Sequence, residues 1–325
     1  MLLKGALVGL LLLGAVVLYF WISYWQSFRR FEAVVKRLEQ TQKAALEAKP
    51  STQVSHRELQ EKEHTIHYFV SGEGKETLVF LHPAFGDHRC FTSQIDAFSK
   101  EYKVITLDML GHGLSQAKET EAHIGMTAQH VIRILDKEGV QKAHLIGVSM
   151  GSLMAQYVAL RYPKRVQSLT VTGGYNISFE NKEVQSRQRR EIFQWMLMGL
   201  LMPLKVMKSY TAQMTCYHDL QKARFYLYQQ PWTRSLFRYM RGLGEVLQPR
   251  KEPFTTHPTM LVVGEHDDPL SLKANRDWHK RDPKTTLHII KNAGHCANMD
   301  SPSDFNSTLR TFLQKHALKP SVGDL

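Results

Sequence analysis

The sequence predicts an α/β fold with a mostly parallel central sheet and helices on both faces. Two observations carry this prediction. From about residue 64 onward, short apolar runs of strand length alternate with segments of helical periodicity, which is typical of parallel strands joined by crossover helices. Polar turns also follow several of these strands at the end where ligands gather in such sheets. The 325 residues, 43% of them hydrophobic, suffice for one such domain and additional segments.

The predicted strands form two groups that are separated by a helical block, and a closing helix follows at 303–315. The strands are expected at 65–70, 77–81, 103–107, 143–148, 166–172, 260–263 and 286–290, with helices at 126–137 and 150–162. The predicted divisions are 57–175 and 256–325 for the core, 176–255 for a helical block between the strands at 166–172 and 260–263, and 1–25 and 26–56 before the core.

The first 56 residues are predicted to lie outside this core. Gly5–Trp25 is a run of 21 residues without a charged side chain, a length that suits a membrane-spanning helix and predicts an anchor at 1–25. A cleaved signal peptide is the alternative, but large aromatic residues stand where a small-residue cleavage site is expected. Apolar residues then recur at helical spacing from Phe28 to Leu38, which predicts a juxtamembrane helix within 26–56.

The net charge of +12 is concentrated in two segments. Residues 1–50 carry 7 basic and 3 acidic side chains, a net charge of +4, and residues 176–255 carry 13 and 6, a net charge of +7. Because anionic headgroups attract such segments, a membrane is the expected partner, through the N-terminal helix and the basic block, and no nucleic acid is expected. A solvated basic face is the alternative. More positive charge follows the apolar run than precedes it, which predicts a single-pass protein with its large domain in the cytoplasm.

Gly147-Val148-Ser149-Met150-Gly151 joins a predicted strand to a predicted helix. In that context the pattern Gly-x-Ser-x-Gly exposes the serine hydroxyl at a sharp turn. A serine becomes a nucleophile when a base takes its proton and an acid orients that base. Asp267 and His295 each follow a late strand, in the order Ser, Asp, His. The sequence therefore predicts a catalytic triad of Ser149, Asp267 and His295, with Asp268 as the alternative acid.

An oxyanion that develops at this serine needs two fixed N–H donors. The backbone of Met150, directly after the serine, is one predicted donor. The other is expected from the loop after the strand at 77–81, where Pro83 has no N–H to donate. Ala84 is therefore the predicted second donor, and Phe85 is the alternative.

The inserted block is helical in character and rich in methionine. Its run Ile192–Met202 is apolar nearly all round, which is typical of a buried helix, and core packing is one interpretation. The other interpretation is a lid over a pocket, because methionine packs adaptably around apolar ligands. On that interpretation Phe85, Trp195 and Met198 are predicted to line the substrate pocket. No HExxH or CxxC pattern is present, and no metal or other cofactor is predicted.

With these motifs in place, residues 60–318 resemble the α/β-hydrolase fold superfamily, in particular its esterase-lipase and peroxidase-like branch, which has a helical lid between the sixth and seventh strands of the family fold. The residues that carry the resemblance are Gly147–Gly151, Asp108–Ser115, Gly264–Asp267 and Ala293–His295. The turn at Asp108–Ser115 has a structural role in that superfamily, so Asp108 is not predicted to be catalytic. The loop after the strand at 77–81 departs from the family pattern, because it has His-Pro-Ala-Phe where relatives often have His-Gly-x-Pro.

The resemblance and the triad together imply a membrane-anchored serine hydrolase. Its expected substrates are carboxylic esters of hydrophobic acyl groups, either small molecules or lipids, which it would cleave through an acyl-enzyme. A serine nucleophile argues against epoxide hydrolases and dehalogenases, which use a carboxylate at this position. Thioesterase, acyltransferase, amidase and carbon–carbon bond hydrolase activities are alternatives on the same triad. A non-enzymatic, membrane-tethered binding protein is the alternative outside the enzymes.

Overall fold

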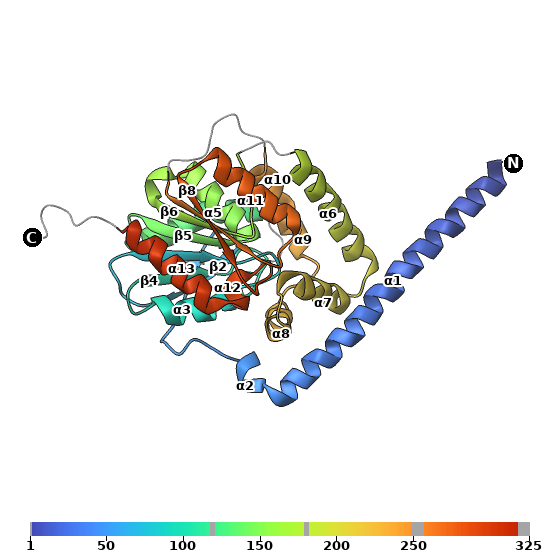
Figure 1. Cartoon of the computed structure of the whole chain (residues 1–325), viewed down its shortest axis with the longest axis horizontal. Helices are drawn as coiled ribbons and strands as arrows, with labels where there is room; N and C mark the ends of the chain where they lie inside the picture. The colour runs from blue at the N-terminus through green and yellow to red at the C-terminus, as the bar shows by residue number, and fades with distance from the viewer. Residues whose placement is uncertain (1, 118–120, 179–181, 249–256, 318–325) are drawn as a thin grey trace, which may run out of the picture.

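The protein is described from a computed structural model, in which residues 2–117, 121–178, 182–248 and 257–317 are placed. Its centre is a sheet of eight described strands in the order β1-β2-β4-β3-β5-β6-β7-β8 (Figure 1). The pairs from β4 to β8 are parallel, and β2 is antiparallel to both of its neighbours. The strands are β1 (Ser55–Gln60), β2 (Thr65–Ser71), β3 (Thr77–Leu81), β4 (Lys103–Leu107), β5 (Ala143–Val148), β6 (Val166–Thr172), β7 (Thr259–Gly264) and β8 (Thr285–Ile290).

The central strands are apolar along their whole length because both faces of the sheet are covered. Every residue of β3, β5 and β7 is buried, as expected for parallel strands between two layers of helices. On β3, Leu78 and Phe80 pack into one core and Val79 and Leu81 into the other, as the alternation of side chains along a strand requires.

Helices cover the two faces of the sheet in separate layers. The core on one face includes side chains of α3 (Thr92–Phe98) and α13 (Pro302–Lys315). The core on the other face includes side chains of α4 (Thr127–Lys137), α5 (Met150–Arg161) and α11 (Pro269–Arg281). The predicted α/β fold with helices on both faces is therefore confirmed.

A helical insertion joins β6 to β7, where the sequence predicts one. We use "the insertion" for its described helices, which lie together on one side of the sheet in Figure 1. They are α6 (Lys182–Leu201), α7 (Leu204–Thr215), α8 (Asp219–Tyr228), α9 (Leu236–Tyr239), η4 (Met240–Gly242) and α10 (Leu243–Val246). Shorter connecting elements are α2 (Lys43–Leu46), η1 (His88–Phe91), η2 (Ile124–Met126), η3 (Pro163–Arg165) and α12 (Ala297–Asp300).

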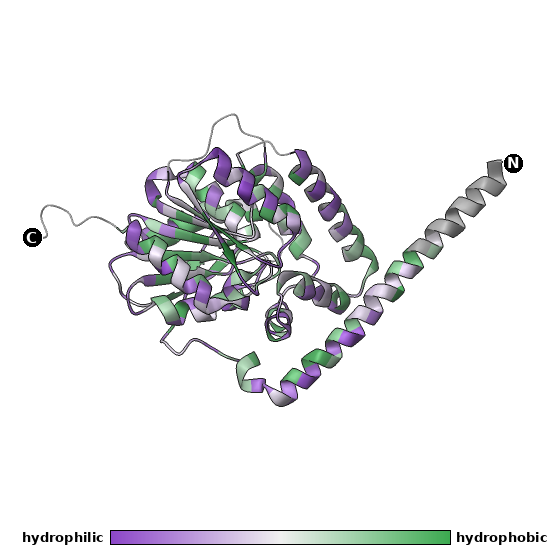
Figure 2. Ribbon diagram, viewed as in Figure 1, coloured by the Kyte–Doolittle hydropathy of each residue, from purple (hydrophilic) through white to green (hydrophobic). Residues whose placement is uncertain are grey.

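The N-terminal segment differs from its prediction in one respect. The expected anchor and juxtamembrane helix are parts of one continuous helix, α1 (Leu2–Thr41), which extends away from the body of the protein (Figures 1 and 2). Phe28 and Leu38 are buried on its inward face, which contacts α7 and α8. The side chains of residues 1–13 and of Val16, which include much of the predicted span, lie outside the described part of the chain. Among the described residues, no helix has the length and apolar character needed to span a membrane.

The strand β1 is absent from the sequence-based prediction, as are the helices α3 and α11. Its residues alternate neither in polarity nor in burial, because it lies at the sheet edge and only Leu59 is buried. The hydrophobic periodicity on which strand prediction depends is therefore absent from Ser55–Gln60.

Candidate active site

Ser149 lies at the sharp turn between β5 and α5. Its φ of 52° and ψ of −120° are uncommon for a residue with a side chain, and its N–H donates to the carbonyl of Thr172 at 2.7 Å. Glycine is needed on both sides of it. A Cβ at Gly147 would lie 2.3 Å from the carbonyl oxygen of Gly151, and a Cβ at Gly151 would lie 2.0 Å from that of Leu81.

We therefore expect Gly151→Ala to lower the free energy of unfolding by about 1–3 kcal/mol, as overpacking against a fixed backbone does. The matched control is Gly244→Ala, because a Cβ at Gly244 meets no atom within 4 Å. Urea denaturation of both variants measures the difference. Equal stability of the two variants would show that the turn at Ser149 has room for a side chain.

His295 brings the other two predicted residues to this serine. Its Nε2 lies 2.7 Å from the Oγ of Ser149, and its Nδ1 lies 2.8 Å from the Oδ1 of Asp267. An ionised carboxylate can only accept hydrogen bonds. Nδ1 of His295 therefore carries the proton that is donated to Asp267, and Nε2 is free to accept the proton of the Ser149 hydroxyl. Asp267 follows β7 and His295 follows β8, at the sheet edge where Ser149 follows β5.

The surroundings of Asp267 and His295 shift their pKa values in opposite directions. Burial acts to raise the pKa of Asp267, but the adjacent His295 outweighs it, together with hydrogen bonds from the Asp268 N–H at 2.7 Å and the Ser271 hydroxyl at 2.9 Å, so that the pKa is lowered. Burial acts to lower the pKa of His295, but the charge of Asp267 outweighs it and raises the pKa above its usual 6.5. The lowered pKa keeps Asp267 ionised, and the raised pKa lets the neutral imidazole of His295 accept a proton readily.

The alternative acid, Asp268, is engaged elsewhere. Its Oδ1 accepts the N–H of Leu270 at 2.8 Å and caps α11, and its Oδ2 accepts from the guanidinium of Arg187 at 2.7 Å. The Nε of Arg187 donates to Glu191 at 2.7 Å. These contacts fix α6 of the insertion to the loop that carries Asp267. The geometry thus favours Asp267 over Asp268 as the partner of His295.

The loop after β3 is held from within the core by His82. This fully buried side chain accepts the N–H of Met109 through Nε2 at 2.9 Å and donates from Nδ1 to the carbonyl of Pro83 at 2.8 Å. Burial lowers the pKa of His82, so the neutral ring keeps these two roles. Ala84, one residue further on, lines a cavity beside Ser149, whereas Phe85 is not among the described lining residues.

The cavity beside Ser149 has a volume of about 240 Å³. Its wall is mainly apolar and is shared by the sheet edge and the insertion. The residues that line it are Ala84, Ser149, Met150, Leu153, Gly173, Gly174, Tyr175, Val184, Arg187, Glu191, Met240, Leu243, Asp268, Leu270, Ser271, Ala274 and His295.

Comparison with known proteins agrees with the observed fold. Residues 76–201 match the family described as alpha/beta hydrolase fold. The chain has the α/β-hydrolase fold. A 2-hydroxy-6-oxononadienedioate/2-hydroxy-6-oxononatrienedioate hydrolase of Paraburkholderia phymatum is 29% identical over 268 residues, which cover 76% of this chain and 90% of the relative.

Solved structures show the same fold at lower identity. A thermophilic esterase from Thermogutta terrifontis aligns with a TM-score of 0.67 at 19% identity, covering 81% of this chain and all of the esterase chain. A membrane phospholipase A, described as a bacterial virulence factor, aligns with a TM-score of 0.62 at 21% identity. That alignment covers 96% of this chain and 98% of the phospholipase chain, so it reaches beyond the α/β-hydrolase core.

Three predicted pocket residues of this α/β-hydrolase lie elsewhere. Phe85, Trp195 and Met198 are not among the described residues that line the cavity beside Ser149. Phe85 and Met198 are buried in the core on the α3 side of the sheet, and Trp195 packs against that core. The apolar side of α6 is used for packing here, so the core interpretation of its methionine-rich run holds for Met198.

The turn that begins at Asp108 has a structural role in this α/β-hydrolase, as the resemblance implies. Its buried carboxylate accepts the N–H and the Nδ1 of His88, both at 2.8 Å, and the N–H of Leu114 at 2.8 Å. Asp87, His88 and Asp108 stand close enough together to hold a metal ion, as do His56, Glu58 and His67. The prediction that the protein uses no metal therefore stays a prediction.

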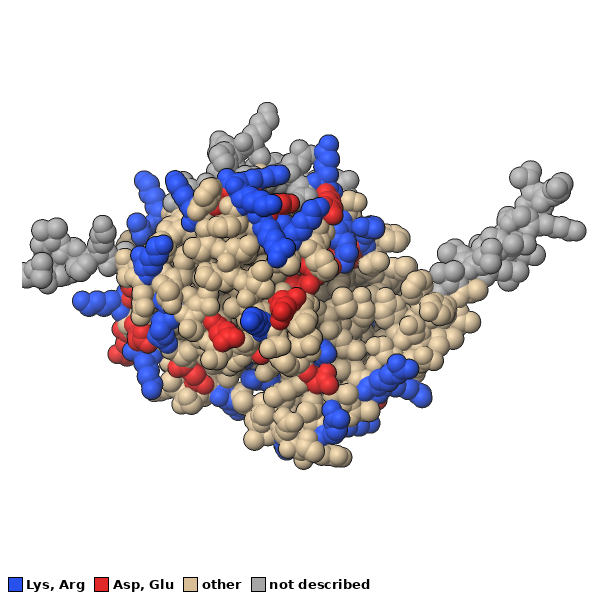
Figure 3. All heavy atoms as spheres, in the orientation of Figure 1, with Lys and Arg blue, Asp and Glu red and all other residues tan. Residues whose placement is uncertain are grey.

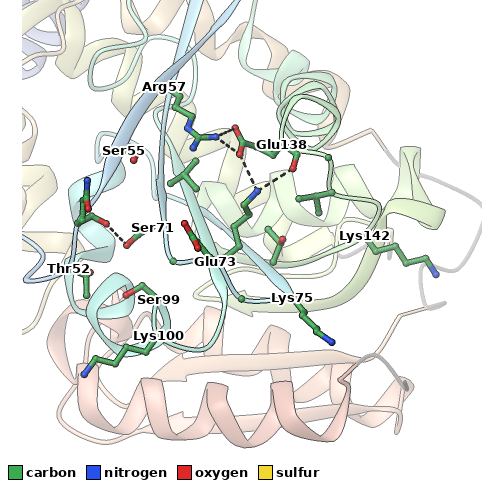
Figure 4. A pocket seen from close by; sticks show the side chains of 18 of the residues that line it. Thr52, Ser55, Arg57, Ser71, Glu73, Lys75, Ser99, Lys100, Glu138 and Lys142 are labelled. Atoms are coloured by element: carbon green, nitrogen blue, oxygen red, sulfur yellow. Dashed lines mark hydrogen bonds and ion pairs between the residues drawn. The ribbon is translucent and has the colours of Figure 1, made fainter. Parts of the chain in front are cut away.

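A larger cavity of about 1050 Å³ lies at the other edge of the sheet, where β3, β4 and β5 begin (Figure 4). Polar and apolar groups share its wall about equally. The wall includes Glu138, which accepts from Arg57 at 2.6 Å, from Lys103 at 3.3 Å and from Tyr68 at 2.9 Å. None of the predicted site residues lines it. Because functional groups of open α/β sheets gather at the carboxyl ends of the strands, the smaller cavity beside Ser149 is the better candidate site.

The site residues predicted from the sequence do not include Ser271, Arg187 or Glu191, which the structure places at the site. Ser271 lies on the first turn of α11, four residues after Asp267, and that spacing is the one signal that could have indicated its hydrogen bond to the carboxylate. Arg187 and Glu191 are one helical turn apart on α6. Such pairs are common on exposed helices, so their sequence alone does not point to a site.

Proposed function

We propose that this protein is a serine hydrolase that cleaves carboxylic esters of hydrophobic acyl groups. The observation that carries the proposal is the hydrogen-bonded series from Asp267 through His295 to Ser149, at the wall of an apolar cavity. A serine paired with a base, and a base oriented by a buried carboxylate, are the parts that nucleophilic acyl transfer requires.

In the proposed reaction, the Oγ of Ser149 attacks the ester carbonyl carbon while the Nε2 of His295 takes the hydroxyl proton. Asp267 stabilises the imidazolium that forms, and the N–H groups of Ala84 and Met150 donate to the oxyanion. The tetrahedral intermediate then expels the alcohol, which receives its proton from His295. Water attacks the acyl-enzyme by the same route, and the carboxylic acid leaves without any cofactor.

The lining of the cavity supports an uncharged acyl group as the substrate part that it binds. Leu153, Val184 and Leu243 are among its apolar side chains. The relative from Paraburkholderia phymatum is named for dicarboxylate substrates, and this makes a carbon–carbon bond hydrolase the second candidate. Apart from His295, the one basic side chain in the described lining is Arg187, which is already paired with Asp268 and Glu191. The cavity therefore favours esters over dicarboxylates.

The volume of the cavity favours short and medium acyl chains. About 240 Å³ lies slightly below the range of roughly 300–1,000 Å³ that is usual for pockets that hold drug-sized ligands. A fluorophosphonate probe should label the protein, and mass spectrometry should place the label on Ser149. In a series of p-nitrophenyl esters, kcat/KM should be highest at short to medium chain length. Absence of the label, or turnover of the dienedioate in preference to the esters, would contradict the proposal.

We also propose that the protein contacts a membrane through α1 and the insertion. Val17–Ile22 on α1 are exposed although apolar or aromatic, as are Phe193 and Leu200 on α6, which are 66% and 78% exposed. Figure 3 shows Lys and Arg at the top of one face, and a mostly uncharged surface between the body and α1. The aligned phospholipase is itself described as a membrane protein.

Flotation of the full chain with phosphatidylglycerol vesicles should exceed its flotation with phosphatidylcholine vesicles. Recovery of the chain only at the bottom of the gradient would contradict membrane contact.

A further inference from the structure

A row of aromatic rings connects α1 to the loop that carries the proposed oxyanion donor. Tyr24 of α1 contacts Tyr210 of α7 with ring centroids 5.1 Å apart, and Tyr210 contacts Trp195 of α6 at 5.9 Å. Trp195 contacts Phe85 at 5.1 Å, and Phe85 contacts Trp232 at 5.3 Å. We call these five side chains the aromatic row. It reaches from the N-terminal helix, through two helices of the insertion, to the residue directly after Ala84.

The backbone of Phe85 has a conformation that its own side chain disfavours. Its φ is +68°, in the left-handed region that favours glycine. The N–H of Gly86 donates to the carbonyl of Pro83 at 3.1 Å and closes a four-residue turn. A positive φ at the third position of such a turn is characteristic of type II, where glycine is the usual residue. The side chain of Phe85 is only 8% exposed and is held by Trp195 and Trp232, so its packing opposes the backbone preference.

A four-residue turn of this kind can adopt two discrete arrangements, type I and type II. If the φ of Phe85 became negative, the turn would change from type II to type I, and the peptide between Ala84 and Phe85 would rotate. The preceding peptide is tied to the core, because Nδ1 of His82 donates to the carbonyl of Pro83. Packing of Phe85 therefore decides which arrangement the loop adopts beside Ser149.

We propose that the aromatic row positions the oxyanion loop and couples the N-terminal helix to the site of reaction. Phe85 and Trp195 are positioning residues. Tyr24 connects α1 to them through its contact with Tyr210, so a shift of α1 changes their packing. The coupling rests on the proposed function, because the peptide that rotates, with the carbonyl of Ala84 and the N–H of Phe85, directly follows the peptide whose N–H is the proposed oxyanion donor. Its physical basis is a two-state turn, which is the element that energetic coupling between distant sites requires.

The first experiment separates the backbone conformation of Phe85 from its packing. Phe85→Ala should lower kcat for a p-nitrophenyl ester by up to about 10²-fold, with KM changed less than about threefold, because a changed orientation of the peptide beside an oxyanion donor costs at most about what loss of the donor costs. Phe85→Gly removes even more of the side chain but adopts a positive φ without strain. It should therefore keep at least roughly ten times the kcat of Phe85→Ala. Equal losses of kcat, or a loss that appears in KM, would overturn the positioning role.

The second experiment tests the connection to α1 with two matched variants. Tyr24→Ala removes a T-shaped contact with Tyr210, in which the ring planes are 89° apart. Phe31→Ala removes a T-shaped contact between α1 and Tyr226, also at 89°, which lies outside the aromatic row. Tyr24→Ala should lower kcat by roughly three- to thirtyfold, the usual range for coupling between distant sites, and Tyr24→Phe should restore it. Phe31→Ala should leave kcat unchanged although Phe31 is 5% exposed.

The outcomes distinguish the coupling from the proposed function. Circular dichroism and thermal unfolding of each variant show that it is folded at the assay temperature. If the unmodified chain fails to react with a fluorophosphonate at Ser149, the proposed function fails. If it reacts, but Tyr24→Ala and Phe31→Ala lower kcat equally or leave it unchanged, the hydrolase assignment stands and the coupling is wrong.

Discussion

Replacement of Ser149 with alanine is expected to lower kcat for ester hydrolysis by roughly four to six orders of magnitude, as loss of a triad nucleophile does in serine hydrolases. The reason is geometric. The Oγ of Ser149 is the group to which Nε2 of His295 is directed at 2.7 Å, and no other hydroxyl has that relation to His295 in the described residues. Without this hydroxyl, only substrate binding and the oxyanion donors still accelerate hydrolysis.

The measurement is steady-state hydrolysis of the ester that the unmodified protein cleaves best, together with fluorophosphonate labelling. Ser307→Ala on α13 is the control, because this exposed serine lies outside the candidate site. It should retain full activity and labelling. Residual hydrolysis within about tenfold of the unmodified protein in Ser149→Ala would show that another group is the nucleophile, since a true nucleophile contributes far more.

The fold and the triad could be predicted because both follow from the pattern of the parallel sheet. Strands such as β5 and β7 are buried on both faces, and their apolar runs are visible in the sequence. Once strands are assigned, the residues after their carboxyl ends must meet at one edge. Ser149, Asp267 and His295 therefore converge although up to 146 residues separate them.

Other features depend on contacts that the sequence pattern does not contain. Asp267 and Asp268 are adjacent and chemically identical, and only the contacts with His295 and Arg187 distinguish them. The lid interpretation predicts that Trp195 lines the substrate pocket, but it packs on Phe85 instead. A helix that is apolar nearly all round gives no periodic signal of which side faces the cavity.

Replacement of Asp267 with asparagine is expected to lower kcat by about 10⁴-fold, because an amide neither fixes the tautomer of His295 nor stabilises its imidazolium. Asp268→Asn is the matched control. It changes the neighbouring carboxylate, which caps α11 and pairs with Arg187, so kcat should fall by less than about tenfold, as expected for a residue outside the triad. A larger loss in Asp268→Asn than in Asp267→Asn would reverse the assignment of the acid.

The pH dependence of kcat/KM supplies an independent test of the same pair. Neutral His295 is the form that takes the serine proton, so activity falls as the pH decreases through the pKa of His295. In the unmodified protein Asp267 raises that pKa above 6.5 against the effect of burial, so the acid limb of the profile should lie above pH 6.5. Asp267→Asn removes the negative charge that raises the pKa of His295. Burial remains, and it lowers that pKa because it disfavours the charged imidazolium. The residual activity of that variant should therefore persist to lower pH than in the unmodified protein. An acid limb that stays in place, or moves to higher pH, would mean that Asp267 does not set the protonation of His295, because removal of a neighbouring negative charge can only lower the pKa of a histidine.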